Sequence, residues 1–250
     1  MKKTTLILAV IVLALTACSK QERTEHKLVD GILSEDYETS FKAMDDFCTW
    51  VKSDKSTMSH DFKYSQEKLG MKVLTSSDGK VRCYSWVTAR EDTIVNYANI
   101  VQWLSGEQMV AFSGPLDAML TGRKPTIKRQ WSLAHSIDTI FDIQNASRPI
   151  YLFVESYVNE EGMSFVYVTA AINQGLKLQV LPFFFNGIET AGNRQYIDDG
   201  KVNKMDLIKW DEKAQKLYAY MTDDNNRVIP GKYEEYRLDT QQFVKIASEE

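Results

Sequence analysis

The chain of 250 residues has little of what common catalytic and metal sites need. It contains three histidines, His26, His60 and His135, and none of them stands in a zinc-binding spacing such as H-E-x-x-H or beside paired cysteines. The sequence also lacks the G-x-S-x-G turn of serine hydrolases and the glycine-rich loops that bind nucleotide phosphates. These absences argue against zinc, hydrolase and nucleotide chemistry, and we expect neither a cofactor nor a bound metal.

Long hydrophobic runs are scarce as well. The uninterrupted run from Leu6 to Leu15 follows Lys2 and Lys3, and it is too short for a membrane-spanning helix, which needs about 20 apolar residues. A later apolar stretch, residues 176–185, is broken by polar side chains and a proline. A charged start followed by a short apolar run is typical of a signal peptide, which we expect to cover residues 1–17.

The end of this region, Leu15-Thr16-Ala17-Cys18, resembles the lipobox of bacterial lipoproteins. The resemblance implies cleavage before Cys18 and acylation of this cysteine, so that the membrane is a partner through the lipid anchor. Several acyl chains give stable anchoring, whereas a single chain binds a bilayer only marginally. Ser19 stands where some lipoproteins carry an aspartate that retains them in the inner membrane. The resemblance therefore favours the outer membrane, at its periplasmic or surface face.

The net charge and the cysteine content indicate which partners and which disulfide are possible. Removal of residues 1–17 takes away Lys2 and Lys3 and leaves 28 basic against 34 acidic side chains, a formal charge of −6. This balance argues against nucleic acid as a partner, because binding to nucleic acid depends on the neutralisation of phosphates. Cys48 and Cys83 then remain as an even pair in an oxidising compartment, which permits a disulfide between them.

Hydrophobic periodicity divides the rest of the chain into three parts. Residues 18–33 are polar and mixed in charge, which is typical of a flexible tether. Residues 34–70 are predicted to be helical, with apolar side chains on one helical face at Tyr37, Phe41, Met44, Cys48 and Val51. Residues 71–250 are predicted to form a β domain. We expect the helix to pack on the strand around Cys83, which would bring the two cysteines together.

From residue 71 onward the hydrophobic period is close to two, as in half-buried strands. Residues 81–88 alternate in this way after the turn signal Ser77-Asp78-Gly79-Lys80. Further strands are expected at residues 95–104, 109–112, 131–143, 150–157, 163–172, 176–185, 205–210, 216–221, 233–238 and 243–246. Short strands joined by tight turns predict an α+β fold that is mostly β, built as an antiparallel meander in a sandwich or an open barrel. An incomplete propeller is less favoured, because no repeat of about 40 to 50 residues is found.

Two segments resemble a stretch that recurs in uncharacterised lipoproteins and secreted proteins of Bacteroidetes. They are residues 77–86, SDGKVRCYSW, and residues 97–103, YANIVQW. The resemblance covers about residues 71–104. It implies no activity, because that family has no assigned function to transfer.

The candidate ligand-binding residues are aromatic or acidic. The tryptophans fit the core of a β domain better than a platform for sugars, since strands of period two bury such side chains; they are Trp50, Trp86, Trp103, Trp131 and Trp210. The acidic pairs fall mostly in predicted turns, where Asp is favoured for backbone reasons; they are Glu160-Glu161, Asp198-Asp199, Asp223-Asp224 and Glu234-Glu235. Thr93 and Thr139 stand in an Asp-Thr-aliphatic pattern that resembles the acceptor of Bacteroidetes O-glycosylation.

These patterns favour an envelope-anchored lipoprotein that acts as a non-enzymatic binding or interaction module, with an unknown protein or glycan as its partner. The alternative is a glycan-binding or glycan-processing lipoprotein of the outer membrane, which the aromatic and acidic residues of a β scaffold support. A cleft lined by two carboxyl groups about 5 to 9.5 Å apart would favour glycan hydrolysis.

Overall fold

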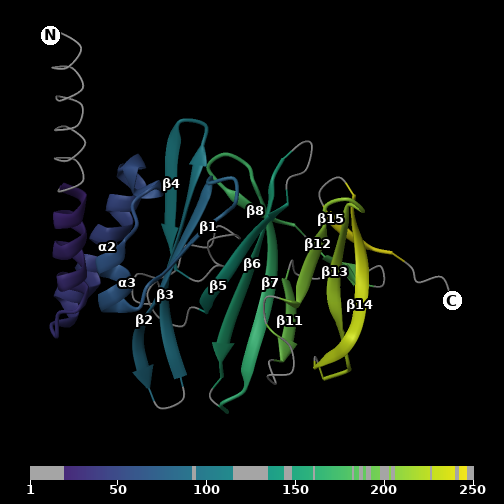
Figure 1. Cartoon of the computed structure of the whole chain (residues 1–250). Coiled ribbons are helices and arrows are strands. Elements are labelled where there is room, and N and C mark those ends of the chain that lie inside the picture. Colours follow the sequence, from purple (N-terminus) through teal and green to yellow (C-terminus); the bar gives the residue numbers. More distant parts are fainter. Residues whose placement is uncertain are drawn as a thin grey trace, which may run out of the picture.

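The elements of the protein stack in four layers, a helical layer followed by three β-sheets (Figure 1). Each space between neighbouring layers is filled by a cluster of buried hydrophobic side chains. The computed structural model describes residues 20–91, 94–114, 135–143, 148–159, 161–181, 183–185, 188–189, 193–197, 203, 206–225, 227–239 and 242–246. Within these residues, no helix is both long and apolar enough to cross a membrane.

The helical layer consists of a helix over residues 20–32, α2 (Tyr37–Ser53), the short 3-10 helix η1 (Lys55–Met58) and α3 (Lys63–Leu69). α2 begins where the N-cap residue Asp36 accepts a hydrogen bond from the Thr39 N–H. α3 ends at Gly70, which adopts the left-handed conformation that suits a glycine after a helix. The helices expected within residues 34–70 are therefore present, and Gly70 is the stop.

The first of these helices replaces the flexible tether that the sequence predicts over residues 18–33. Leu28 belongs to the core between the helices and the first sheet. Glu25, 2% exposed, accepts hydrogen bonds from the N–H and the hydroxyl of Ser65 and pairs with His60 at 2.7 Å. The tether prediction is wrong for the described part of this segment, because its charged residues include one that is buried and paired.

Sheet A contains β1 (Lys72–Thr75), β2 (Val81–Glu91), β3 (Ile94–Ser105) and β4 (Gln108–Ser113), paired antiparallel in that order. Tyr84 and Trp86 face the helices and join their core. Arg82 projects from the same face and donates hydrogen bonds to the carbonyl oxygens of Thr57, at 2.5 Å, and His60, at 2.6 Å. Apolar contacts and buried hydrogen bonds together fix the helical layer on sheet A.

Sheet B contains β5 (Ser136–Ile143), β6 (Ile150–Val158), β7 (Ser164–Asn173), β8 (Leu178–Leu181) and β11 (Asn193–Ile197). Its strand order is β11-β7-β6-β5, with β8 also paired to β7, so β5 is an edge strand. β6 is buried on both faces, because Tyr151 and Phe153 contact sheet A while Leu152 and Val154 contact the third sheet. This two-sided burial explains the nearly continuous apolar run of β6 in the sequence.

Sheet C contains β9 (Phe183–Phe185), β10 (Ile188–Glu189), β12 (Ile208–Asp211), β13 (Lys216–Thr222), β14 (Val228–Asp239) and β15 (Gln242–Lys245). Its order is β10-β9-β15-β14-β13-β12, which leaves β12 at an edge. The pairing is antiparallel except between β9 and β15. Leu217, Ala219, Tyr236 and Phe243 point into the core shared with sheet B.

The fold class predicted from the sequence, α+β and mostly β, is confirmed. Successive sheets pack face to face as in a sandwich, with a third sheet added to the usual two. Among the described strands, pairing stays within each of the three sheets, an arrangement that differs from an open barrel.

The disulfide prediction is wrong, because Cys48 and Cys83 are both free. α2 packs on sheet A as expected, but it covers the face that carries Tyr84, and Cys48 lies at that interface. Cys83 points from the opposite face of β2 into the core shared with sheet B, since neighbouring strand residues project to opposite sides. The sheet itself separates the two thiols. Burial raises the pKa of Cys48 to about 11, and burial also raises the pKa of Cys83.

Candidate binding site at the edges of the three sheets

The edge strands β1, β5 and β12 border a cavity of about 520 Å³ that is partly open to solvent. Every sheet contributes to its lining, which consists of Thr75 and Ser77 from sheet A, Ile140, Phe141, Asp142, Ile143 and Leu152 from sheet B, and Ile208, Lys209 and Trp210 from sheet C. Pockets that hold small ligands have volumes of about 300 to 1,000 Å³. The cavity is therefore large enough for a ligand.

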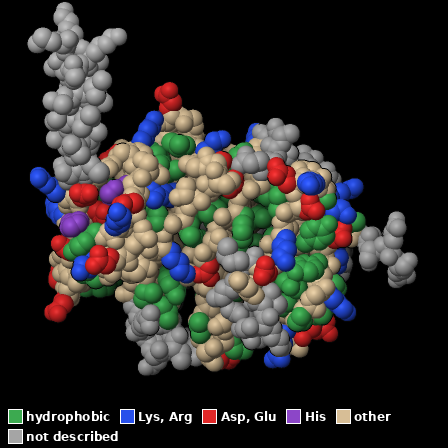
Figure 2. Space-filling view, viewed as in Figure 1, with side chains coloured by type: hydrophobic (Ala, Val, Ile, Leu, Met, Phe, Trp, Pro, Cys, Tyr) green, Lys and Arg blue, Asp and Glu red, His purple; other side chains and the backbone are tan. Residues whose placement is uncertain are grey.

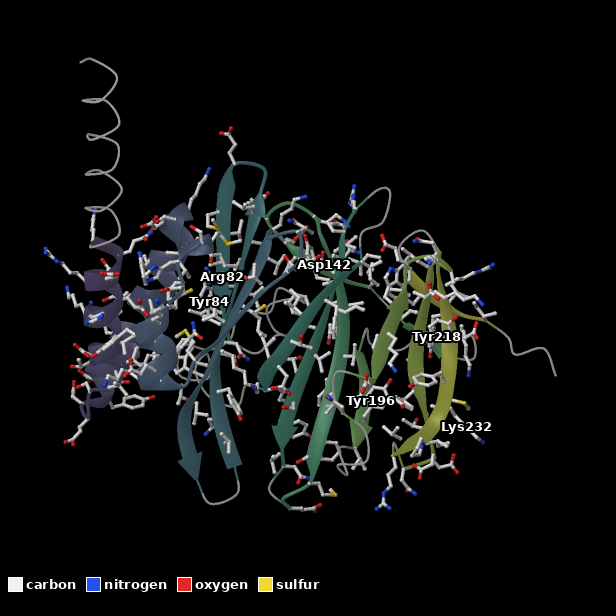
Figure 3. The ribbon with its side chains drawn as sticks, viewed as in Figure 1. Arg82, Tyr84, Asp142, Tyr196, Tyr218 and Lys232 are labelled. Atoms are coloured by element: carbon white, nitrogen blue, oxygen red, sulfur yellow. The ribbon has the colours of Figure 1, made fainter. Side chains whose placement is uncertain are left out.

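Hydrogen bonds from the β1–β2 turn fix the polar wall of the cavity. Asp142 of β5 accepts hydrogen bonds from the Ser77 N–H, at 2.5 Å, and from the Ser77 hydroxyl, at 2.6 Å. In the same turn, Asp78 accepts a hydrogen bond from the Tyr151 hydroxyl at 2.9 Å. Figure 3 labels Asp142 near the upper end of sheet B. These contacts join sheets A and B at their edges, so this wall is preformed.

The opposite wall is apolar and belongs to the core between sheets B and C. Phe141 and Trp210 are partly buried and pack against that core, which includes Ile143. Phe141 and Ile143 share one face of β5, whereas Asp142 between them points toward Ser77. A short piece of one edge strand thus supplies both apolar and charged groups to the cavity.

Lys209 of β12 lies at the edge of the cavity, and its ammonium is directed to the outer face of sheet C. Its ammonium lies 5.5 Å from the centroid of the Tyr233 ring, 3.4 Å from the Tyr233 hydroxyl and 3.7 Å from the Asp206 carboxylate. The hydrogen bond with Tyr233 raises the pKa of Lys209, so the ammonium stays charged at neutral pH. Both polar contacts are longer than the ~2.7 to 2.9 Å of strong charge-assisted hydrogen bonds. The ammonium therefore keeps donor capacity for a ligand.

The described lining of the cavity combines aromatic rings, hydroxyls and one carboxylate, and the Lys209 ammonium lies beyond its edge on the outer face of sheet C. Among the described residues that line the cavity, Asp142 alone carries a carboxylate, whereas glycoside hydrolysis generally uses two. In the described part of the chain, no group of three or more His, Cys, Asp or Glu side chains is placed to hold a metal ion. The arrangement is suited to holding a polar molecule that has an apolar face.

Of the residues singled out in the sequence for modification by lipid or glycan, Thr139 is described, and it is not among the residues that line the cavity. Cys18 and Thr93 lie outside the described residues. Thr139 is 8% exposed within β5. This burial disagrees with its prediction as an O-glycosylation acceptor, because attachment of a glycan needs an accessible hydroxyl.

The tryptophans divide between the core and the cavity. Trp86 and Trp103 are 1% and 2% exposed and belong to the cores on the two faces of sheet A, as expected. Trp50 packs against the helical core, and Trp131 lies outside the described residues. Trp210 is the tryptophan that lines the cavity.

The acidic pairs do not converge on a common site. Glu234 and Glu235 project to opposite faces of β14, where each pairs with a different lysine. Asp223 accepts hydrogen bonds from two backbone N–H groups within its turn. Asp198, Asp199 and Glu160 lie outside the described residues.

Sequence reasoning missed the cavity itself. The turn signal at Ser77 is its one local sign, and nothing in the sequence around Asp142 or Lys209 marks either residue as part of a site. No protein-family model, curated protein or solved structure matches the chain. The functional argument therefore depends on the residues of the cavity.

Proposed function

We propose that the protein is an envelope-anchored lipoprotein that binds a carbohydrate in the cavity between β1, β5 and β12 without converting it. The lining of the cavity carries the proposal, because aromatic rings stand there beside hydroxyl and carboxylate groups. The lipobox that ends at Cys18 supports the anchor. The proposed location is the outer membrane, at its periplasmic or surface face.

The chemistry of a sugar ring matches this lining. A sugar has an apolar face of C–H groups, against which Trp210 and Phe141 offer aromatic rings. Its hydroxyls can donate hydrogen bonds to the carboxylate of Asp142. A purely apolar ligand would displace water from this polar wall without replacing the hydrogen bonds of that water, which is unfavourable. The polar wall therefore favours a hydroxyl-rich ligand.

Two features favour binding over turnover. Both carboxylate oxygens of Asp142 accept hydrogen bonds from Ser77, which holds the side chain in one orientation. A glycosidase needs a second carboxyl group across the scissile bond, and the described lining provides only one. The preformed wall is suited to recognising a ligand and releasing it unchanged.

Direct binding measurements test this proposal. The full-length protein, kept in mild detergent, is titrated by calorimetry with saccharides from bacterial envelopes and from dietary polysaccharides. We expect saturable binding, weakened about tenfold or more by Asp142→Asn, which corresponds to about 1.4 kcal/mol. Lys232→Ala serves as the control, since Lys232 is an exposed residue of β14 outside the cavity lining (Figure 3).

Two results would contradict the binding proposal. One is the lack of saturable binding by every saccharide tested. The other is release of reducing ends during incubation, and its loss in Asp142→Asn would favour the glycan-processing alternative. The anchor is tested separately by metabolic labelling with a fatty-acid analogue, which should label the wild type and not Cys18→Ala.

A further inference from the structure

The outer face of sheet C carries three partly buried tyrosines, which we call the tyrosine platform: Tyr218 and Tyr220 of β13, and Tyr233 of β14. By alternation they lie on the side of their strands away from sheet B, since Leu217 and Ala219 point into the core between the sheets, and Tyr220 also packs against that core. Tyr220 and Tyr233 are cross-strand partners with ring centroids 4.1 Å apart. Sheet C is the last layer of the stack, and Figure 3 labels Tyr218 on it (Figures 1 and 3).

Lys209 connects the tyrosine platform with the cavity. It is the cross-strand partner of Tyr218, and its ammonium lies over the ring of Tyr233. Lys209 is also one of the residues at the cavity, next to Trp210 of the aromatic wall, while its ammonium lies on the side of the tyrosines. β12 is an edge strand of four residues. The cavity and the platform therefore lie on the two sides of one narrow strand.

We propose that the tyrosine platform is a second subsite and that the ligand is an oligosaccharide chain, which runs from the cavity around β12 onto the outer face of sheet C. This inference rests on the proposed function, because it extends the ligand of the cavity. The inner and outer faces of one sheet are separated by roughly the 10 Å at which stacked sheets pack. A chain of linked sugars spans that distance, whereas a single sugar ring fills only one of the two subsites.

The chemistry of the platform fits further sugar units of the same chain. Tyrosine rings offer a flat apolar face and a hydroxyl that can hydrogen-bond. Lys209, whose contacts with Tyr233 and Asp206 are 3.4 and 3.7 Å long, can donate hydrogen bonds where the chain passes the edge. These donors match the hydroxyl and ring oxygens that a sugar presents on either side of a linkage.

The charges around the tyrosine platform favour a neutral oligosaccharide as the ligand. On the same face of sheet C, Lys216 and Glu235 pair at 2.7 Å and so neutralise each other. Figure 2 views the layers from the side, and on the side of the molecule that it shows Lys and Arg are interspersed with Asp and Glu. A surface of this kind gives no preference for a strongly charged polymer.

A series of chain lengths tests the second subsite. Neutral oligosaccharides of one type, from the monosaccharide to the hexasaccharide, are titrated into the full-length protein in detergent. We expect affinity to rise with length as the platform becomes occupied. The double variant Tyr218→Ala/Tyr220→Ala should reduce the ratio of long-chain to short-chain affinity about tenfold. These tyrosines are chosen because Tyr233 contacts Lys209 of the cavity.

Two further variants separate the platform from general effects. Tyr218→Phe/Tyr220→Phe keeps the rings and should keep most of the length dependence. Tyr37→Ala removes a tyrosine that is 67% exposed on α2 and should leave the ratio unchanged. Circular dichroism confirms that each variant is folded.

The possible failures are distinguishable. If no chain of any length binds, both the proposed function and the second subsite are overturned. If all lengths bind with equal affinity, or if the gain with length persists in the alanine double variant, the second subsite is overturned while the cavity remains the binding site. If the ratio of long-chain to short-chain affinity falls as much in Tyr37→Ala as in the double variant, the proposal that the tyrosine platform is a subsite is also overturned.

Discussion

A single carboxylate, Glu25, ties the N-terminal helix to the rest of the helical layer. It accepts hydrogen bonds from the N–H and hydroxyl of Ser65, at 2.7 and 2.8 Å, and meets Nε2 of His60 at 2.7 Å. Burial by itself raises the pKa of Glu25, but the hydrogen bonds from His60 and Ser65 outweigh burial and bring the pKa below its ordinary value of 4.5. The carboxylate is therefore charged in the folded protein at neutral pH.

This lowered pKa makes part of the stability depend on pH. Because the pKa is lower in the folded than in the unfolded chain, the contribution of Glu25 is fully present above about pH 4.5 and is lost as the pH falls through the folded-state pKa. We expect Glu25→Gln to lower the free energy of unfolding at neutral pH, by an amount that shrinks below about pH 4.5. Urea unfolding over a pH series measures this difference, with the exposed Glu22→Gln as control. A difference that stays constant at low pH would rule out the ionised carboxylate of Glu25 as its source.

Arg82 stabilises an unusual backbone conformation at Phe62. Phe62 has a φ of +53°, in the left-handed region that non-glycine residues seldom adopt. The guanidinium of Arg82 binds the carbonyl oxygens of Thr57 and His60 in the same loop and lies 5.2 Å from the Phe62 ring. Contacts of one buried side chain with both backbone and ring offset the cost of this conformation.

At the scale of elements, the helix over residues 20–32 is the main feature that the sequence does not reveal. Its buried face consists of Glu25, Leu28, Val29 and Ile32, spaced as on one side of a helix. One of these four residues, Glu25, is charged. From the sequence alone this face therefore reads as polar, because burial of Glu25 depends on its contacts with His60 and Ser65. Those partners lie 35 and 40 residues further along the chain, beyond the reach of local periodicity.

Several strands lie where the sequence predicts them, including β6, which is buried on both faces. The expected strands at residues 95–104, 150–157, 163–172 and 216–221 correspond to β3, β6, β7 and β13. The single strand expected at residues 176–185 is instead two, β8 in sheet B and β9 in sheet C. A continuous apolar run does not show where the chain passes from one sheet to the next.

The cavity could not be predicted from local patterns. Ser77, Asp142 and Trp210 come from three different sheets, and their proximity follows from the order in which the sheets stack. Periodicity indicates which face of each strand is buried, but it does not indicate which edge strands become neighbours. The site is a property of the assembled layers.

The crossing of the first helix over α2 gives a testable packing contact. A Cβ atom at Gly31 would lie 2.8 Å from the Cβ of Ala43, closer than such atoms approach. Alanine is favoured over glycine inside helices by about 1 kcal/mol, but overpacking costs about 1 to 3 kcal/mol. We therefore expect Gly31→Ala to lower the Tm measured by circular dichroism, and Ala43→Gly added to it to restore part of the loss. If Gly31→Ala raises the Tm, the helices do not cross this closely.

At the scale of the whole molecule, three cores lie in series between four layers. The helix that follows the lipobox in the sequence belongs to the first layer, and the tyrosine platform lies on the last. With about 10 Å between neighbouring layers, the platform is about 30 Å from that helix. Reach away from the membrane would thus come from the depth of the fold and not from a long flexible tether.

Limited proteolysis distinguishes a docked helix from a tether. Trypsin cleaves after lysine and arginine in mobile segments, and Arg23 and Lys27 are exposed residues of the helix. We expect both sites to resist cleavage in the native protein and to be cut in urea, as identified by mass spectrometry of the fragments. Rapid native cleavage at either site would show that the helix does not stay docked.

The edge strands that border the cavity also have features that hinder self-association of the protein. β1 and β12 are only four residues long and carry the exposed Lys72 and Lys209, while the pairing of β5 with β6 shifts between Ile137 and Thr139. Short strands, lysines and bulges each hinder the joining of sheets from different molecules. Under the proposed anchoring, copies side by side on one membrane would be crowded enough for unprotected strand edges to form fibres. Edges of the kind seen here would keep neighbouring copies apart and leave the cavity open to the proposed ligand.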